Sequence, residues 1–556
     1  MPFRKRDLRR FSRIVSVLAR HGFHDFLDRL KARYHGVPRK NFIRERRAQE
    51  ALPLSVPERL RLVFEELGPT FIKFAQVLSS RPDVIPPEYI KELAKLQDEV
   101  PEFPFDDARK LIETQLGRPL AELFLHIDEK PRAAASLAQV HRARLLSGED
   151  VAVKVQRTGI DEIIENDIRI LREFASLMER RIPESRFYEP TGLVDDFART
   201  IRHELDFARE GRNIDRFRKY FAATPIVYIP KVYWDLTTSK VLTIEYIDGI
   251  KITDIGRLEA AGLDRKAIAV NGANITLKEV FEFRFFHADP HPGNIFVREN
   301  NVIAPVDFGM TGTIEEDVAE QMSGIFLAVL QKDVDDLVKN LRSIGVAEDL
   351  EDVRNFKIDV RDLLERYYDV PLEKLEIGNI TRELMGIVRR YRLHLPHNFA
   401  MIAKALIITE GVGRVLYPEF NIIEIARPYA RRLLWKRYDP RRQLSEIRNM
   451  ASDVLGFLRV LPTDLREIFT IIRKGKFTMR FEHRGLELLV DELDRSSNRI
   501  SFAVVIAALI VGSSLIFQTG VGPTFFGYPI IGLAGFLLAS ILGIWLLIGI
   551  MRSKRL

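Results

Sequence analysis

Three polar residues in the middle of the chain constrain this sequence more than any other feature. The stretch Phe286–Asn294 contains Asp289, and Asn294 follows it five residues later. A short apolar segment, 301–306, then leads to Asp307-Phe308-Gly309. Phosphoryl transfer needs such a set, because one carboxylate stands beside the reacting phosphate while an amide and a second carboxylate hold magnesium. The spacing predicts Asp289 as the catalytic residue and Asn294 and Asp307 as Mg²⁺ ligands.

Length and composition bound the remaining possibilities. A chain of 556 residues is expected to form two or three folded units. The absence of cysteine excludes disulfides, thiolate metal sites and cysteine nucleophiles. The net charge of +7 is compatible with nucleic acid or anionic lipid. Because the basic residues gather at the N-terminus and beside apolar C-terminal segments, lipid is the expected partner and nucleic acid is not.

The first half of the chain opens with two helical regions. Residues 1–55 are rich in arginine and lysine with apolar residues at helical spacing, which predicts a basic amphipathic segment. A solvated arm would show the same composition, whereas a secretory signal would need a longer uninterrupted apolar run. Residues 56–130 form a second helical pattern, in which Lys73 and Gln76 share one helical face.

From residue 131 to 250 the pattern alternates between strands and helices. A turn of small residues joins two strands at Ala133, Ala134, Ala135 and Ser136. Further strands are expected at 151–155, 232–234 and 240–246, and helices at 160–181 and 193–220. This is the element order of the N-lobe in kinase-like folds. With 251–437 as a mostly helical C-lobe and 438–498 as a helical linker, the predicted fold class is α+β and bilobal.

Lys154 lies in one of these strands, where it could reach the α- and β-phosphates of a nucleotide. It needs an anionic partner, and the predicted helix 193–220 carries Glu204, Asp206 and Glu210. Glu204 and Asp206 are two residues apart, so they should point toward different neighbours.

Two further features of the predicted site have simpler interpretations. Glu245 ends a strand near the predicted turn between lobes, where it could contact a nucleotide base or be an exposed strand carboxylate. His287 and His291 could suggest a metal, but in a proline-containing loop they are expected to act as scaffolding.

The chain also departs from an ordinary kinase pattern in two places. Alanines stand where glycines usually let backbone amides wrap phosphates. A helical pattern begins at Glu315, soon after Gly309, which leaves no room for a long activation segment. These departures predict that the phosphate site is retained and that the groove for a protein substrate is missing.

Two apolar runs, 500–517 and 530–551, close the sequence. Each is long enough to cross a membrane, and together they predict a transmembrane hairpin over 499–551. The turn between them lacks lysine and arginine, whereas the outer ends carry Arg495, Arg499, Arg552, Lys554 and Arg555. Both ends should therefore face the cytoplasm, together with the soluble body. A buried core hairpin is the alternative.

Several of these motifs, in this order, resemble the UbiB family of atypical kinase-like proteins, which support ubiquinone biosynthesis. They are the Ala-rich turn 133–136, Lys154, Glu204-Leu205-Asp206 with Glu210 and Asn213, residues 287–294, and Asp307-Phe308-Gly309. The match covers roughly residues 56–430, and the C-terminal hairpin resembles the bacterial members.

The resemblance assigns roles to residues that had none. In that family a Lys-x-Gly-Gln helix lies over the active site, blocks peptides and pairs with a Glu-x-Asp motif. By resemblance Lys73 and Gln76 take those roles near Glu204 and Asp206, and Glu210 becomes the partner of Lys154. Where the family has a glycine, this chain has Ala75.

The resemblance implies an Mg²⁺-dependent ATPase of the phosphotransferase class, with ATP or ADP as the nucleotide. The nucleotide would be held by the Ala-rich turn, Lys154, Glu210 and Glu245, under the helix that carries Lys73. Its expected partners are membrane lipids, quinone precursors and other quinone-biosynthesis enzymes. A protein or small-molecule kinase and a nucleotide-gated scaffold without turnover remain as alternatives.

Overall fold

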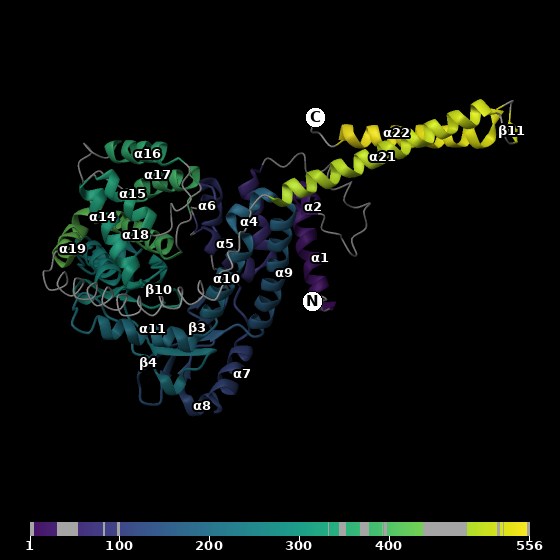
Figure 1. The fold of residues 1–556 in the computed structure, drawn as a ribbon. Helices are drawn as coiled ribbons and strands as arrows, with labels where there is room; N and C mark the ends of the chain where they lie inside the picture. The colour runs from purple at the N-terminus through teal and green to yellow at the C-terminus, as the bar shows by residue number, and fades with distance from the viewer. Residues whose placement is uncertain are drawn as a thin grey trace, which may run out of the picture. The chain divides into compact units, whose positions relative to one another are not determined.

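The computed structural model describes most of the chain as two compact units, Met1–Arg442 and Gln443–Leu556 (Figure 1). The described residues are 5–30, 54–79, 81, 84–96, 101–331, 333–343, 352–366, 377–391, 393, 397–437, 486–519, 523–525 and 528–552. Most of the predicted helical linker, residues 438–485, lies outside them.

An antiparallel sheet forms the centre of the N-lobe. Its strands are β1 (Phe124–Ile127), β2 (Ala133–Ala134), β3 (Ala138–Leu145), β4 (Asp150–Gln156) and β5 (Val241–Glu245). They run in the order β1-β3-β4-β5, and β2 pairs with β3. Valines alternate along β4 and are buried against α7 (Phe105–Leu116) and α8 (Leu120–Leu123). Since side chains alternate across a strand, Lys154 lies on the other face of the sheet.

Between β4 and β5 the chain forms a set of helices. They are α9 (Ile160–Arg181), the 3₁₀ segments η1 (Pro183–Tyr188) and η2 (Trp234–Leu236), α10 (Pro190–Glu204) and α11 (Phe207–Tyr220). The bounds of α9 agree with the predicted helix 160–181.

The single helix expected at 193–220 is wrong, because the chain breaks at Leu205 and Asp206. Asp206 has an extended backbone at the start of α11, and the Phe207 N–H donates to the Ser239 carbonyl at 3.0 Å. This bond turns Phe207 into the core, where it is 1% exposed. The strand expected at 232–234 is also wrong, since only Val232 bridges to Ile244 before η2 begins.

The N-terminal region packs as a helical layer against α9 and α10 (Figure 1). Its helices are α1 (Lys5–Arg20), α2 (His24–Leu30), α4 (Val56–Leu67), α5 (Pro69–Ser79) and α6 (Pro87–Leu93). The prediction of basic amphipathic helices is confirmed for residues 5–30, but the solvated arm is wrong there. Ile14, Val17 and Leu27 are at most 2% exposed, because the apolar face of this pair completes the core under α4 and α9.

Arg10 fixes α1 in that layer. Its guanidinium binds both carboxylate oxygens of Asp167 at 2.8 Å and donates to the Leu67 carbonyl at 2.8 Å. The Asp167 side chain is 0% exposed, so this is a buried, bidentate ion pair between α1 and α9.

The C-lobe is mostly helical, with two small antiparallel sheets, β6-β8-β9 and β7-β10. Its strands are β6 (Ile250–Lys251), β7 (Phe285–His287), β8 (Ile295–Arg298), β9 (Val302–Pro305) and β10 (Thr311–Thr313). Its first helical segments are α12 (Ile255–Ala260), α13 (Arg265–Lys278), the π-helical η3 (Glu279–Phe283), η4 (Pro292–Asn294) and η5 (Glu299–Asn301). The later helices are α14 (Glu316–Gln331), α15 (Val334–Ser343), α16 (Val353–Arg366), α17 (Ile377–Arg390), α18 (His397–Leu416) and α19 (Ile422–Arg437).

Aromatic packing joins the lobes behind the predicted site. The ring of Phe217 on α11 lies 4.8 Å from Phe285 and 5.2 Å from Phe308, measured between ring centroids. Phe308 belongs to the Asp-Phe-Gly stretch and is 1% exposed. Burial of this side chain therefore holds the backbone of its neighbour Asp307 in place.

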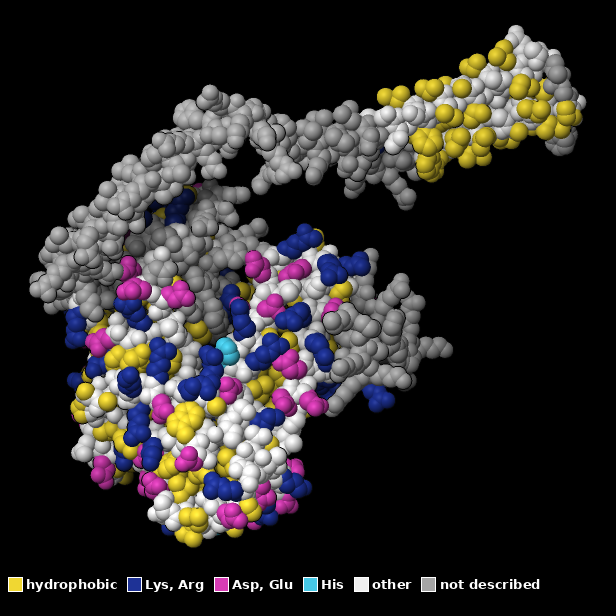
Figure 2. Space-filling view, turned by 60° about the horizontal axis from the view of Figure 1, so that its bottom comes forward, with side chains coloured by type: hydrophobic (Ala, Val, Ile, Leu, Met, Phe, Trp, Pro, Cys, Tyr) yellow, Lys and Arg dark blue, Asp and Glu magenta, His cyan; other side chains and the backbone are white. Residues whose placement is uncertain are grey.

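The second unit contains a helical hairpin formed by α21 (Leu486–Thr519) and α22 (Ile530–Arg552), with the short strands β11 (Thr524–Phe525) and β12 (Tyr528–Pro529) between them. Ser496–Thr519 and Ile530–Leu547 are long and apolar enough to cross a membrane, with only 6% and 11% of their residues buried. Apolar side chains cover the visible face of this hairpin (Figure 2). A core hairpin would be buried, so the exposure favours a membrane-facing role over that alternative.

Candidate functional site

The predicted catalytic loop is held between two strands by a buried histidine. His287 ends β7, pairs with Thr311 of β10 and donates from Nε2 to the Asp307 carbonyl at 2.7 Å. Its Nδ1 accepts from the Asp289 N–H at 3.1 Å. Burial lowers the pKa of His287, so the neutral ring can donate on one side and accept on the other. His291 accepts from the Gly293 N–H at 3.2 Å, and both contacts support the predicted scaffolding role.

Asn294 and Asp307 lie together, as their spacing predicted. The Asn294 amide contacts Asp307 Oδ2 at 3.3 Å, and the Val306 N–H donates to the Asn294 carbonyl at 3.0 Å. The Gly309 N–H donates to Asp307 Oδ1 at 2.9 Å. Burial opposes ionisation of Asp307, but the Lys154 ammonium and this N–H outweigh it and lower the pKa of Asp307 to about 2. An ionised carboxylate beside an amide supplies the hard oxygen atoms that Mg²⁺ prefers, so these residues fit the ion.

Lys154 is the centre of the charge network. Its Nζ lies 2.9 Å from both carboxylate oxygens of Glu210 and 3.9 Å from Asp307 Oδ1. Burial alone would lower the pKa of Lys154, but these two carboxylates raise it instead. Glu210 also accepts from the Phe308 N–H at 3.4 Å, which ties α11 to the Asp-Phe-Gly stretch. Asn213, one turn later on α11, donates to the Phe308 carbonyl at 3.1 Å.

A second ion pair, beside this network, joins α5 to the end of α10. Lys73 Nζ lies 3.1 Å from Glu204 Oε2, and the two side chains are 15% and 9% exposed. Asp206 instead pairs with Arg212 at 3.1 Å, so Glu204 and Asp206 point toward different neighbours, as expected. The positive charge of Lys73 also helps to lower the pKa of Asp307.

Two further residues of α5, Gln76 and Ala75, were assigned by resemblance, and both lie in its packed part. Gln76 lies one turn from Lys73 and is half-buried. Ala75 is 0% exposed, which shows that this tightly packed position accommodates a methyl group in place of the glycine expected by resemblance.

The Ala-rich turn forms the predicted connection between two strands. Ala133 and Ala134 make up β2, and the Ala135 N–H donates to the Ala138 carbonyl at 2.7 Å. Ser136 is 0% exposed. The turn therefore presents a short, methyl-lined edge, and Arg157 donates to the Ala135 carbonyl at 3.5 Å.

Glu245 is occupied by neighbours in its own lobe. Its oxygens accept from the Tyr228 hydroxyl at 2.7 Å and from the Lys231 N–H at 3.2 Å. Within the described part of the chain, no ion pair or hydrogen bond joins Glu245 to the Lys154 network. These contacts indicate a carboxylate that fixes the segment 228–231 beside β5.

Two residues at the site were missed by sequence reasoning. Lys404 on α18 lies with Nζ 3.0 Å from Asp289 Oδ1. Glu279, 6% exposed in the π-helical η3, accepts from the His287 N–H at 3.0 Å, and burial raises its pKa to about 8. No local sequence pattern marks either residue as part of the site. For Glu279 the structure adds one indication, since π-helical turns often occur at functional sites.

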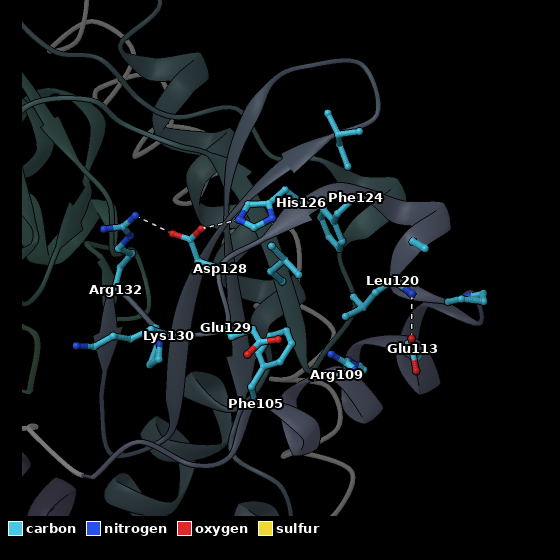
Figure 3. Close-up of a pocket in the computed structure, with 15 residues that line it drawn as sticks. Phe105, Arg109, Glu113, Leu120, Phe124, His126, Asp128, Glu129, Lys130 and Arg132 are labelled. Carbon is cyan, nitrogen blue, oxygen red and sulfur yellow. Dashed lines mark hydrogen bonds and ion pairs between the residues drawn. The ribbon is translucent and has the colours of Figure 1, made fainter.

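The chain also has a hollow of about 1040 Å³ on the outer side of the N-lobe sheet (Figure 3). It is lined from α7, α8, β1 and the following loop, and Phe105, Arg109 and Arg132 are among its residues. None of the predicted site residues lines it. Its apolar wall belongs to the cluster that buries the β4 valines, so it lies on the face of the sheet opposite Lys154.

Three family models match this chain. Residues 95–341 match the ABC1 atypical kinase-like domain, 360–421 the UbiB helical domain, and 484–552 the ABC1/UbiB kinase-like C-terminal domain. An uncharacterized protein from Clostridium pasteurianum is 33% identical, with 98% of this chain and 99% of that protein covered.

Two named relatives and one solved structure are also similar to this chain. A probable protein kinase UbiB from Marinobacter nauticus is 34% identical over 83% of this chain and 85% of its own length. A Pseudomonas aeruginosa protein of that name is 37% identical, covering 72% and 76%. A solved Mycobacterium tuberculosis protein in complex with erythromycin shares 23% identity at a TM-score of 0.46, covering 63% of this chain and 89% of its own. The family matches confirm the bilobal kinase-like fold, and the chain belongs to the UbiB family of atypical kinase-like proteins.

Proposed function

We propose that this protein binds Mg²⁺-ATP and hydrolyses it at a membrane surface in support of isoprenoid quinone biosynthesis. The observation that carries the proposal is the network in which Lys154 contacts Glu210 and approaches Asp307, with Asn294 beside it. Phosphoryl transfer depends on positioning and electrostatics, and this network supplies both.

Each group has a defined task in this reaction. Lys154 would bind the α- and β-phosphates, while Asp307 and Asn294 would hold Mg²⁺, which neutralises charge on the phosphate oxygens when bound. Asp289 would orient a water molecule and accept its proton as the water oxygen bonds to the γ-phosphorus. The bond from that phosphorus to the bridging oxygen breaks, which releases ADP and inorganic phosphate.

The surroundings favour water or a small acceptor over a protein substrate. Only a few residues separate β10 from α14, so the described chain has no activation segment on which a peptide could lie. The pair between Lys73 and Glu204 also fastens α5 to the end of α10. A peptide would have to displace this helix, which is anchored by buried residues such as Phe71 and Phe74.

A membrane role is supported by the C-terminal hairpin and by the family. Two apolar helices that could span a bilayer follow the kinase-like unit, and their positive flanks favour a cytoplasmic catalytic unit at the inner membrane. In this setting ATP turnover would help to present lipid-soluble quinone precursors to other biosynthetic enzymes.

The test measures phosphate release by the purified full-length protein, in detergent and with anionic-lipid vesicles. Wild type should show lipid-stimulated turnover, and Asp307→Asn should lower it about 100-fold or more, as loss of one electrostatic contact at a reacting centre does. Asp335→Asn, an exposed aspartate on α15, is the matched control. Lys73→Ala should alter nucleotide turnover, because α5 closes over the site.

Each alternative has its own signature. Label transfer from ATP to a partner, lost in Asp289→Ala, would indicate a kinase. Tight nucleotide binding without phosphate release would indicate a nucleotide-gated scaffold. Absence of turnover in wild type, together with normal quinone production in cells that carry Asp307→Asn, would reject the proposal.

A further inference from the structure

Lys404 is a cation at the site that lies outside every sequence motif. Its Nζ is 3.0 Å from Asp289 Oδ1, and the two side chains are 26% and 35% exposed. Its neighbour Ile402 is 2% exposed and packs in one apolar cluster with Phe286 and Ala288, which precede Asp289. Packing of α18 therefore sets the position of Lys404 relative to the catalytic loop.

Stability does not account for this ion pair. Partly exposed pairs contribute typically about 0–1 kcal/mol, since solvent screens them and side-chain entropy opposes them. The other two lysines of the site pair with other carboxylates: Lys154 binds Glu210, and Lys73 binds Glu204. Lys404 is a cation in contact with the carboxylate of the predicted catalytic residue.

The predicted catalytic loop lacks a positive side chain for the transferring phosphoryl group, and Lys404 can supply one. Residues 290–293 contain no lysine or arginine. A transferring phosphoryl group is stabilised by positive charge on its outer oxygens. Asp289 stands on the side of the γ-phosphate in a kinase-type site, whereas Lys154 serves the α- and β-phosphates. A lysine that touches Asp289 is thus placed to reach a γ-phosphate oxygen.

We propose that Lys404 binds the γ-phosphate of ATP and exchanges its ion pair with Asp289 for this contact when the nucleotide arrives. In the free protein Lys404 neutralises Asp289. Once it moves to the phosphate, the Asp289 carboxylate is released to orient the attacking water. Lys404 then distinguishes ATP from ADP, which has no γ-phosphate. This inference rests on the nucleotide-binding function proposed above.

The experiment compares the affinity of the full-length protein for Mg²⁺-ADP and for Mg²⁺-AMP-PNP, a nonhydrolysable ATP analogue. Lys404→Ala should weaken AMP-PNP binding about tenfold or more, the range of a hydrogen bond to a charged group, and leave ADP binding within about twofold. Lys404→Arg should retain most of the selectivity. Lys339→Ala, an exposed lysine on α15, is the matched control and should behave as wild type.

A second comparison separates phosphate binding from shielding of Asp289. In an Asp289→Asn background, Lys404→Ala should still weaken AMP-PNP selectively. If Asp289→Asn restores full AMP-PNP affinity to Lys404→Ala, Lys404 only neutralises Asp289 and the inference is overturned. Equal losses for both nucleotides, or no loss, also overturn it while leaving the proposed function intact. If wild type binds neither nucleotide, the proposed function fails and the inference fails with it.

Discussion

Replacing Glu210 with glutamine tests the charge network that positions Lys154. The Glu210 side chain is 4% exposed, and both its oxygens lie 2.9 Å from Lys154 Nζ, which is 23% exposed. Removing one partner of a buried pair costs about 3–5 kcal/mol. Lys154 keeps partial solvent access and Asp307 at 3.9 Å, so we expect a smaller loss, about 2–3 kcal/mol in the free energy of unfolding.

Thermal unfolding of the full-length protein measures this loss. For the unit Met1–Arg442, an unfolding entropy of about 2.1 cal/mol/K per residue converts this loss into a fall in melting temperature of roughly 2–3 °C. Mg²⁺-ADP should narrow the gap, because its phosphates give Lys154 a replacement anion. The double variant Lys154→Met/Glu210→Gln should be more stable than Glu210→Gln alone, since it also removes the lysine charge that has lost its nearest carboxylate. Strictly additive losses, or a Glu210→Gln variant as stable as wild type, would refute the reasoning.

Two further predictions concern groups buried away from the nucleotide. Arg10→Ala should lower the free energy of unfolding by about 3–5 kcal/mol, because it leaves the fully buried Asp167 carboxylate without its cation. Denaturant titration measures this loss, and Arg10→Lys, measured beside it, would show whether the bidentate contact matters. A loss below about 1 kcal/mol would contradict the prediction. Glu279 has a pKa raised to about 8 from 4.5, so the folded protein keeps a proton that the unfolded chain loses, and its contribution to stability falls as pH rises between these values. Glu279→Gln should remove this dependence of the free energy of unfolding on pH, which is at most about 1.4 kcal/mol per pH unit. The variant should therefore be more stable than wild type at pH 8 and about equally stable near pH 5. A difference that does not change with pH would exclude the buried acid as the cause.

Local sequence was sufficient to predict that Asp289, Asn294 and Asp307 lie together and to predict the type of most elements. Asp289 and Asn294 share one loop, and a single short hairpin connects that loop to Asp307. Because the connecting segment is short, few of its conformations could place these three residues far apart. Alternating valines predicted β4, and helical periodicity predicted α9 with the bounds that the structure has. The apolar runs of the hairpin were equally clear, because a membrane-spanning helix needs only length and hydrophobicity.

Tertiary structure decided which distant groups meet and what covers each apolar face. Periodicity showed that α1 has an apolar side, but only packing shows that α4 and α9 cover it. The break at Asp206 follows from a bond to Ser239, far along the chain, which no local preference could indicate. Lys404 reaches Asp289 for the same reason, because its position is set by the packing of Ile402 against Phe286 of β7 and Ala288. Short-range spacing determined the chemical groups of the site, whereas long-range packing determined their charges and partners.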